Sequence, residues 1–390
     1  ITDFVREIDQ TAKSVNANIK TIPEIYPGIE EEAVRVGADV YSLYPLVDTI
    51  AHEYEFGSGD HMASSRTPLD WFTYQVGMAA FRAFAEGKPT WILNYSWDGD
   101  QKVAASQSMQ NLAMSQLMVG ANFWDAAGHS MSGSNHLPTR RRIFRWIEQH
   151  QDVFYQPRRP VDPVGVYFSP STRNYFAKEF ISSFRGVVIL LMQRHLEYQI
   201  VTPRTLRNFA GTTLVLPNVR VLDEDEKAAL RAHVDAGKTL VINGTDATGL
   251  SSPKVVRFPN DSGRAYMHAL ERDFQSTSPE LQSEFLRSLK RQPGIDIKAS
   301  PFVATHIAEV NGELCTFLAN FHGLQAHSNP VQIAEAGARI MVSGKTNSMR
   351  FLPFLGEPRE LKGTQANGKL LFALPPIEKG AVACVKLDAQ

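Results

Sequence analysis

Pro89-Thr-Trp-Ile-Leu-Asn-Tyr95 is an apolar run that leads directly into Trp97-Asp98-Gly99-Asp100. A short apolar run bounded by proline, glycine and polar residues is typical of a buried β-strand. A helix-forming stretch from about Val103 to Val119 follows, and then a second apolar run, Ala121-Asn-Phe-Trp-Asp125. Strands that alternate with helices in this way pair in parallel. The segment therefore predicts part of a parallel α/β sheet.

The same alternation extends back toward residue 1. Two earlier runs, Ile19–Ile25 and Ala38–Tyr44, are predicted strands, and Leu69–Ala85 is a predicted helix that ends at a glycine. The polar segment Val47–Pro68 is a predicted loop, of a length that is usually functional. A complete (β/α)8 barrel needs about 250 residues and eight strands. We therefore expect residues 1–155 to form the second half of a TIM barrel.

Two further units follow a proline-rich linker, Gln156–Pro160. Residues 160–290 contain further apolar strands and helices, including a helix capped by Asp223, and predict an open α/β domain. From residue 295 onward, short alternating strands are separated by Asn-Gly turns. This pattern predicts a small all-β sandwich over residues 295–390.

Charge and composition exclude several classes of protein. The 390 residues include 40 Lys and Arg against 41 Asp and Glu, so there is no basic excess to bind nucleic acid. No apolar run approaches the ~20 residues that span a bilayer, and no membrane partner is expected. Two cysteines, Cys315 and Cys384, are too few for a disulfide scaffold or a cysteine-rich zinc site.

Aromatic and polar residues alternate at the predicted strand ends, where barrel enzymes place their chemistry. An aromatic ring packs against the apolar face of a sugar, while carboxylates and amides hydrogen-bond its hydroxyls. The predicted sugar-binding residues are Tyr44, Asn94, Trp97, Trp124 and Asp125. Glycoside hydrolysis normally uses two carboxylates, and Glu24 and Asp98 are the predicted catalytic pair.

Other chemistries are less well supported. Gly128-His-Ser130-Met-Ser-Gly133 resembles a nucleophile elbow, but its second glycine comes one residue late. Asp98, Asp100, His129 and His136 do not complete a metal-binding spacing. The α/β unit contains neither a dinucleotide-binding nor a phosphate-binding glycine motif. We therefore expect no cofactor and no metal.

The order of units resembles the C-terminal part of clan A glycoside hydrolases, and most of all the family 42 β-galactosidases. Ala38–Pro45 is similar to that family's sixth barrel strand, Lys88–Asn94 to the seventh and Gly120–Asp125 to the eighth, with Ile19–Tyr26 as the fifth. Gly165–Leu250 is similar to its trimerisation domain, which has a glutamine-amidotransferase fold. Neither cysteine lies in that domain, so amidotransferase chemistry is not expected.

The resemblance implies hydrolysis of a β-linked sugar, with a galactoside as one candidate, and a homo-oligomer. It also places the family's nucleophilic glutamate at Asn94, where an amide cannot form the glycosyl ester. The family's acid/base ends the fourth strand, which would precede Ile1. We expect the N-terminal half barrel to come from a companion chain or another segment. Two alternatives to a hydrolase stay open: a sugar-binding protein without catalysis, and a structural subunit.

Overall fold

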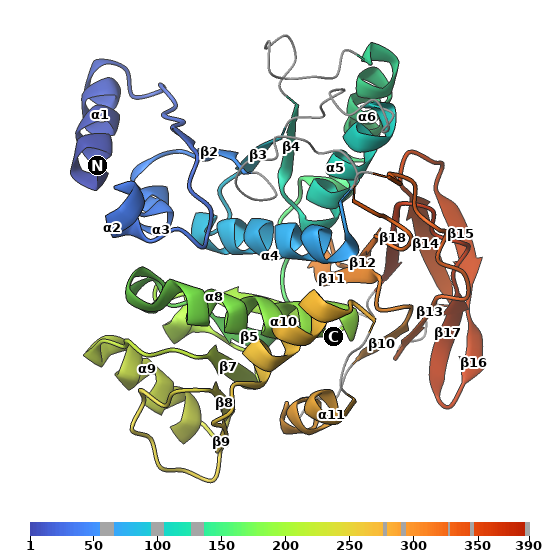
Figure 1. Cartoon of the computed structure of the whole chain (residues 1–390). Helices are drawn as coiled ribbons and strands as arrows, with labels where there is room; N and C mark the ends of the chain where they lie inside the picture. The colour runs from blue at the N-terminus through green and yellow to red at the C-terminus, as the bar shows by residue number, and fades with distance from the viewer. Residues whose placement is uncertain are drawn as a thin grey trace.

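The computed structural model describes residues 1–54, 66–94, 105–125, 136–275, 279–289, 294–326, 328–343 and 347–386. Two parallel sheets and two antiparallel sheets follow one another along this part of the chain (Figure 1). The chain is therefore a mixed α/β protein with parallel sheets, as the sequence predicts. None of the described helices is long and apolar enough to cross a membrane.

The first sheet has four parallel strands in the order of the chain, β1-β2-β3-β4. Its strands are β1 (Glu24–Ile25), β2 (Ile50–Glu53), β3 (Thr90–Asn94) and β4 (Asn122–Asp125). The helices around it are α1 (Thr2–Val15), α2 (Ala33–Val36), α3 (Val40–Leu43), the 3-10 turn η1 (Tyr44–Leu46), α4 (Pro68–Ala85), α5 (Ala105–Val119), α6 (Leu137–Gln149) and α7 (Gln151–Phe154). Helix α4 packs against β3, and α5 packs against β4.

The predicted strand Ala38–Tyr44 is wrong, because this segment is helical. Asp39 is the N-cap of α3: its carboxylate accepts hydrogen bonds from the backbone of Tyr41, at 3.2 Å, and from the Ser42 hydroxyl, at 2.6 Å. The strand lies instead at Ile50–Glu53, inside the segment predicted to be a loop. The predicted strand Ile19–Ile25 is reduced to Glu24 and Ile25.

The second sheet has five parallel strands in the order β6-β5-β7-β8-β9. They are β5 (Val164–Tyr167), β6 (Tyr198–Val201), β7 (Thr213–Pro217), β8 (Thr239–Asn243) and β9 (Val255–Phe258). The surrounding helices are α8 (Pro170–Gln193), η2 (Leu206–Asn208), α9 (Glu224–Asp235), α10 (Ser262–Arg272) and α11 (Pro279–Ser288). Every residue of β5, β7 and β8 is buried, so both faces of this sheet are covered.

Local sequence explains two features of this unit. Asp223 begins α9 in a reciprocal capping box with Glu226, as the predicted cap requires. Helices α8 and α10 pack closely because both carry glycine at their contact: a Cβ on Gly186 would lie 1.8 Å from the carbonyl oxygen of Gly263. A larger residue at either position would force the helices apart.

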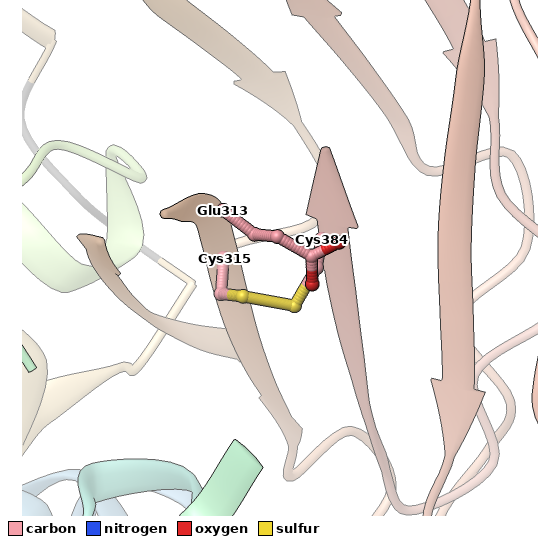
Figure 2. Close-up of side chains that lie close together, drawn as sticks. All are labelled: Glu313, Cys315 and Cys384. Atoms are coloured by element: carbon pink, nitrogen blue, oxygen red, sulfur yellow. A yellow bond between two sulfur atoms is a disulfide. The ribbon is translucent and has the colours of Figure 1, made fainter. Parts of the chain in front are cut away.

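Residues 294–326, 328–343 and 347–386 form a two-sheet antiparallel unit. One sheet is β10 (Ile295–Lys298), β13 (Arg339–Val342), β17 (Lys369–Ala373) and β16 (Thr364–Ala366). The other is β11 (Val303–Val310), β12 (Glu313–Asn320), β18 (Gly380–Lys386), β14 (Ser348–Pro353) and β15 (Arg359–Lys362). Cys315 and Cys384 lie opposite each other on β12 and β18 and form a disulfide (Figure 2).

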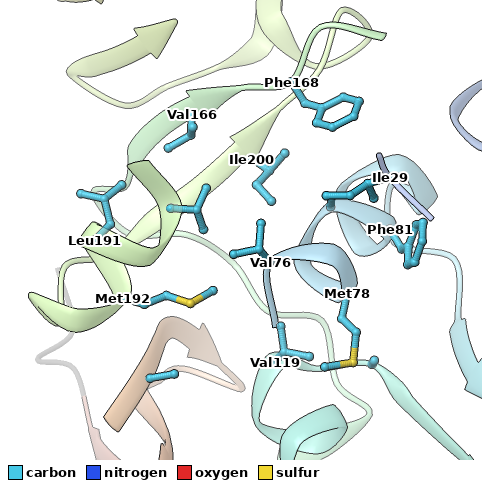
Figure 3. Packing of buried hydrophobic residues seen from close by; sticks show 14 of the residues in the cluster. Ile29, Val76, Met78, Phe81, Val119, Val166, Phe168, Leu191, Met192 and Ile200 are labelled. Carbon is cyan, nitrogen blue, oxygen red and sulfur yellow. The ribbon is translucent and has the colours of Figure 1, made fainter. Parts of the chain in front are cut away.

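One continuous apolar cluster joins the first two sheets and reaches the third unit. Figure 3 shows Val76 and Phe81 of α4 near Ile200 of β6 and Phe168, which follows β5. A buried ion pair adds a polar connection, since the Arg173 guanidinium on α8 lies 2.8 Å from the Asp39 carboxylate. The first two units are therefore packed against each other, through contacts of α4 with α8 and β6, rather than joined only by the linker.

Candidate functional site

The two faces of the first sheet differ in what covers them. Residues that pair across a parallel sheet project to the same face, and successive residues project to opposite faces. On one face, His52 stacks on Phe81 of α4 with ring centroids 3.9 Å apart, and Phe123 contacts Phe144 of α6. Helices therefore cover this face. We call the opposite face of the sheet the open face, because the two contacts with α4 and α6 just described are not made from it.

Strand pairing places two rows of side chains on the open face. The first row comprises Glu24, Ala51, Trp91 and Asn122. The second row comprises Glu53, Leu93 and Trp124. Two carboxylates and two indoles, which come from four strands, thus share one surface.

The carboxylates come from neighbouring strands. Glu24 pairs with Ala51, and Glu53 follows Ala51 by two residues, so the glutamates are diagonal neighbours on the open face. Strand spacing and rise put their Cα atoms about 8 Å apart. Glu24 is exposed and Glu53 is half-buried. Most glycoside hydrolases use two carboxyl groups about 5 to 9.5 Å apart, and neighbouring strands at this Cα distance allow such a separation.

The indoles of Trp91 and Trp124 meet edge to face, with ring centroids 6.3 Å apart. Both side chains are half-buried rather than enclosed in the core. A partly exposed aromatic pair beside carboxylates provides the apolar surface on which a sugar ring can pack. Trp124 lies on β4 and its predicted role as a sugar platform stays a prediction, whereas Trp91 was not among the predicted binding residues.

Tyr44 does not lie at a strand end, and its prediction as a sugar platform is wrong. Its side chain is 1% exposed, and its hydroxyl is hydrogen-bonded to Nε2 of His52 over 2.5 Å. Burial lowers the pKa of His52 to about 3, so the imidazole is neutral. This polar pair belongs to the core beneath the helix-covered face.

Asn94 and Asp125 end β3 and β4 and pair with each other across the sheet. The structure describes their strand positions and not their side chains, so their predicted hydrogen bonds to sugar hydroxyls stay predictions. Trp97 and Asp98 lie outside the described residues. Glu24 is described, and its predicted catalytic role stays a prediction.

Sequence reasoning missed Glu53 because it placed the strand in the wrong segment. Asp39, followed three residues later by Ser42, is a helix-starting pattern, and Pro45 prevents a strand from continuing. β2 is Ile50-Ala-His-Glu53, in which only the first two residues are apolar, so the signal for this strand in the sequence is short. Glu53 then follows as the first carboxylate of that strand.

Among the described residues, one group brings together three potential metal ligands: Glu313, Cys315 and Cys384 (Figure 2). The two sulfur atoms are bonded to each other, so neither is a thiolate that could bind a metal. The Glu313 carboxylate lies 2.9 Å from the Arg350 guanidinium. These contacts make the group a structural link between strands rather than a metal centre.

Solved structures with a similar fold are glycoside hydrolases. α-L-Fucosidase isoenzyme 2 from Paenibacillus thiaminolyticus has a TM-score of 0.67 at 9% identity, and the match covers 100% of this chain and 71% of that one. The exo-carrageenase GH42 from Bacteroides ovatus has a TM-score of 0.58 at 12% identity, covering 99% and 55%. Gan42B, a GH42 β-galactosidase from G. stearothermophilus, has a TM-score of 0.62 at 10% identity, covering 99% and 68%.

The chain thus has the fold of this class of glycoside hydrolases over its whole length, and more particularly a GH42-like fold. No protein-family model matches the sequence. No curated protein matches it either. The predicted resemblance to GH42 β-galactosidases is confirmed at the level of the fold.

Proposed function

We propose that this chain carries part of the active site of a glycoside hydrolase that acts on a β-linked sugar, with a galactoside as the first candidate. The observation that carries the proposal is the open face of the first sheet, where Glu24 and Glu53 accompany Trp91 and Trp124. Glu24 supplies one carboxylate. The second is Glu53, or Asp98 as the sequence predicts. The GH42-like fold supports this assignment.

In the proposed enzyme the first sheet is the second half of a (β/α)8 barrel, and the open face lines its interior. Four parallel strands with one open face leave unpaired edges that another half barrel would cover. Helix α1 supports the same arrangement, because Phe4 and Ile8 are 64% and 47% exposed on it. The occupant we propose is the N-terminal half barrel, contributed by a preceding segment or a companion chain.

The test uses protein that contains the complete barrel and a panel of aryl β-glycosides. Glu24→Gln and Glu53→Gln are each expected to lower kcat by at least about 100-fold if the residue acts as acid, base or nucleophile. Glu284→Gln, at an exposed position on α11, is the matched control. Unchanged rates in the Glu24, Glu53 and Asp98 variants would overturn the assignment.

A second candidate function is sugar binding without hydrolysis. It is favoured by Asn94, which ends β3 at the position where the resemblance places the nucleophile. This candidate predicts saturable binding of sugars, measured by tryptophan fluorescence, with no release of the aryl group. Asn94→Glu then separates the two functions: gain of turnover would indicate a lost nucleophile, and no change would leave the carboxylates of the open face as the relevant groups.

We also propose that the second sheet and its helices form the contact of a homo-oligomer. The resemblance to a trimerisation domain supports this arrangement. Light scattering of the complete protein would give a mass close to three protomers, and a strictly monomeric mass would contradict it.

A further inference from the structure

A groove of about 740 Å³ lies at the amino ends of β3 and β4, the end opposite the candidate sugar site. Three units contribute to its lining: Thr90 and Asn122 from the first sheet, Tyr198 from the second and His306 from β11. A ligand held here would touch all three parts of the described chain. The groove shares Asn122 with the open face and contains none of Glu24, Glu53, Trp91 and Trp124.

Two arginine side chains converge in this groove. Arg82 comes from α4, and Arg158 comes from the linker between the first two sheets. A Cβ on Gly120 would lie 2.8 Å from the guanidinium carbon of each arginine, so these two carbons are less than about 6 Å apart, the sum of the two distances. Gly120 has a φ of +88°, and its missing side chain leaves the space that both guanidinium groups border.

The arginines are held by the C-terminal carbonyls of α5. Arg158 donates to Leu117 and Met118, both at 2.7 Å, and Arg82 donates to Val119 at 2.7 Å. A helix C-terminus carries only about half a negative charge. Two full positive charges therefore exceed what α5 can balance.

No carboxylate forms an ion pair with Arg82 or Arg158 within the described ranges. Glu86, the acidic residue of the lining, is paired with Arg204. The Nε–H of Arg158 is buried and has no hydrogen-bond acceptor. Burial and the neighbouring Arg82 charge both lower the pKa of the Arg158 guanidinium, which is what an unbalanced cation produces.

The His306 side chain adds no charge of its own. His306 lies between the Tyr198 hydroxyl, at 3.0 Å from Nδ1, and the Gln75 amide oxygen, at 2.6 Å from Nε2. Burial, with the charges of Arg158 and Arg82, keeps its pKa low, so the imidazole is neutral. Lys88 adds a further cation to the lining and donates to the carbonyls of Tyr44 and Val47, both at 2.6 Å.

We propose that this groove is a binding site for a small molecule bearing a phosphate, sulfate or carboxylate group, which is held between the guanidinium groups of Arg82 and Arg158. Planar guanidinium groups suit oxyanions because they offer paired N–H donors in a fixed plane. The free Nε–H of Arg158 supplies a donor that no protein group satisfies. Binding would link the three units that line the groove.

Calorimetry on the full protein tests the site with inorganic phosphate, sulfate and citrate, each at constant ionic strength. We expect one saturable site for at least one of them, and sugar phosphates and uronic acids then identify the larger ligand class. Arg82→Gln and Arg158→Gln should each weaken binding at least about 10-fold. Arg159→Gln is the matched control, because this exposed neighbour does not line the groove. Absence of saturable binding, or equal binding by all variants, would overturn the proposal.

Removal of the α5 contacts could unfold the arginine variants, so a second measurement uses the unmodified protein. Phenylglyoxal reacts with accessible arginines, and peptide mass spectrometry gives the rate at Arg82, Arg158 and Arg159 separately. Saturating anion should slow modification of Arg82 and Arg158 at least about 5-fold and leave Arg159 unchanged. Equal rates at Arg82 and Arg158 with and without the anion would contradict the site. Neither measurement depends on hydrolytic activity, so failure of the proposed function leaves this result intact.

Discussion

Both of the first two sheets are built of parallel strands, but they differ in how far their side chains are buried. In the second sheet, β5, β7 and β8 are buried at every residue, and their sequences are nearly continuous apolar runs. In the first sheet, half-buried Trp91 and Trp124 lie on the face opposite buried Ile92 and Phe123. On the open face Ala51 and Leu93 are buried, whereas Glu24, Glu53, Trp91 and Trp124 are exposed or half-buried. The comparison shows that the first sheet keeps polar and aromatic side chains on one face, where the second sheet is buried throughout β5, β7 and β8.

The largest expected effect is in the second sheet. Leu214→Ala removes a fully buried side chain from β7, and we expect a loss of about 3 kcal/mol in the free energy of unfolding. Guanidinium denaturation measures the change. A loss below about 1 kcal/mol would mean that this sheet is not packed on both faces, and the contrast with the first sheet would disappear.

His52 tests the helix-covered face of the first sheet. Its pKa is lowered from 6.5 to about 3 by burial, so the unfolded chain binds the proton first. The contribution of neutral His52 to the free energy of unfolding is therefore fully present above about pH 6.5. It decreases as the pH falls toward 3, by up to about 1.4 kcal/mol per pH unit. Near pH 5 the loss of stability amounts to about 2 kcal/mol.

His52→Gln keeps a hydrogen-bonding side chain near the Tyr44 hydroxyl and removes the titration. Urea denaturation at pH 7 and pH 5 should show a smaller decrease in stability for this variant than for the unmodified protein. His268→Gln is the control, because His268 is exposed on α10. An identical pH dependence in the His52 variant would show that this face is open to water.

Trp124→Ala tests the open face. We expect a loss of only about 1 kcal/mol, most of it from the edge-to-face contact with Trp91. Thermal unfolding measures this difference. A loss as large as that of Leu214→Ala would show that the open face is packed like the second sheet.

Glu24→Gln should have the smallest effect on stability. Its side chain is exposed at the first position of β1, so the free energy of unfolding should change by less than about 0.5 kcal/mol. Chemical denaturation beside Glu284→Gln gives the comparison. A loss above about 1.5 kcal/mol would assign Glu24 a structural rather than a functional role.

The features that the sequence predicted are those that depend on neighbouring residues in the chain. The β3 strand, the α9 cap at Asp223 and the antiparallel turns of the last unit follow from short-range propensity and hydrophobic spacing. Ala38–Tyr44 was mistaken for a strand because its apolar residues were weighed without the cap at Asp39. Apolar content alone does not distinguish a short strand from a short helix.

Long-range contacts could not be predicted from one sequence. Cys315 and Cys384 are separated by 69 residues, and their disulfide depends on the pairing of β12 with β18. The convergence of Arg82 and Arg158 likewise requires α4, α5 and the linker to meet. Trp97 and Asp98 stay predictions of the sequence. The open-face carboxylate Glu53 became visible only when β2 was placed.

The linker between the first two sheets does more than connect them. Arg159 exchanges two backbone hydrogen bonds with Glu309, at 2.9 and 2.8 Å, and so extends the edge of the sheet that begins with β11. A segment fixed in this way is a poor hinge and a poor substrate for proteases. Cleavage at Gln156–Pro160 would separate the first unit from the rest of the chain. It would also remove the backbone partner of Glu309 on β11.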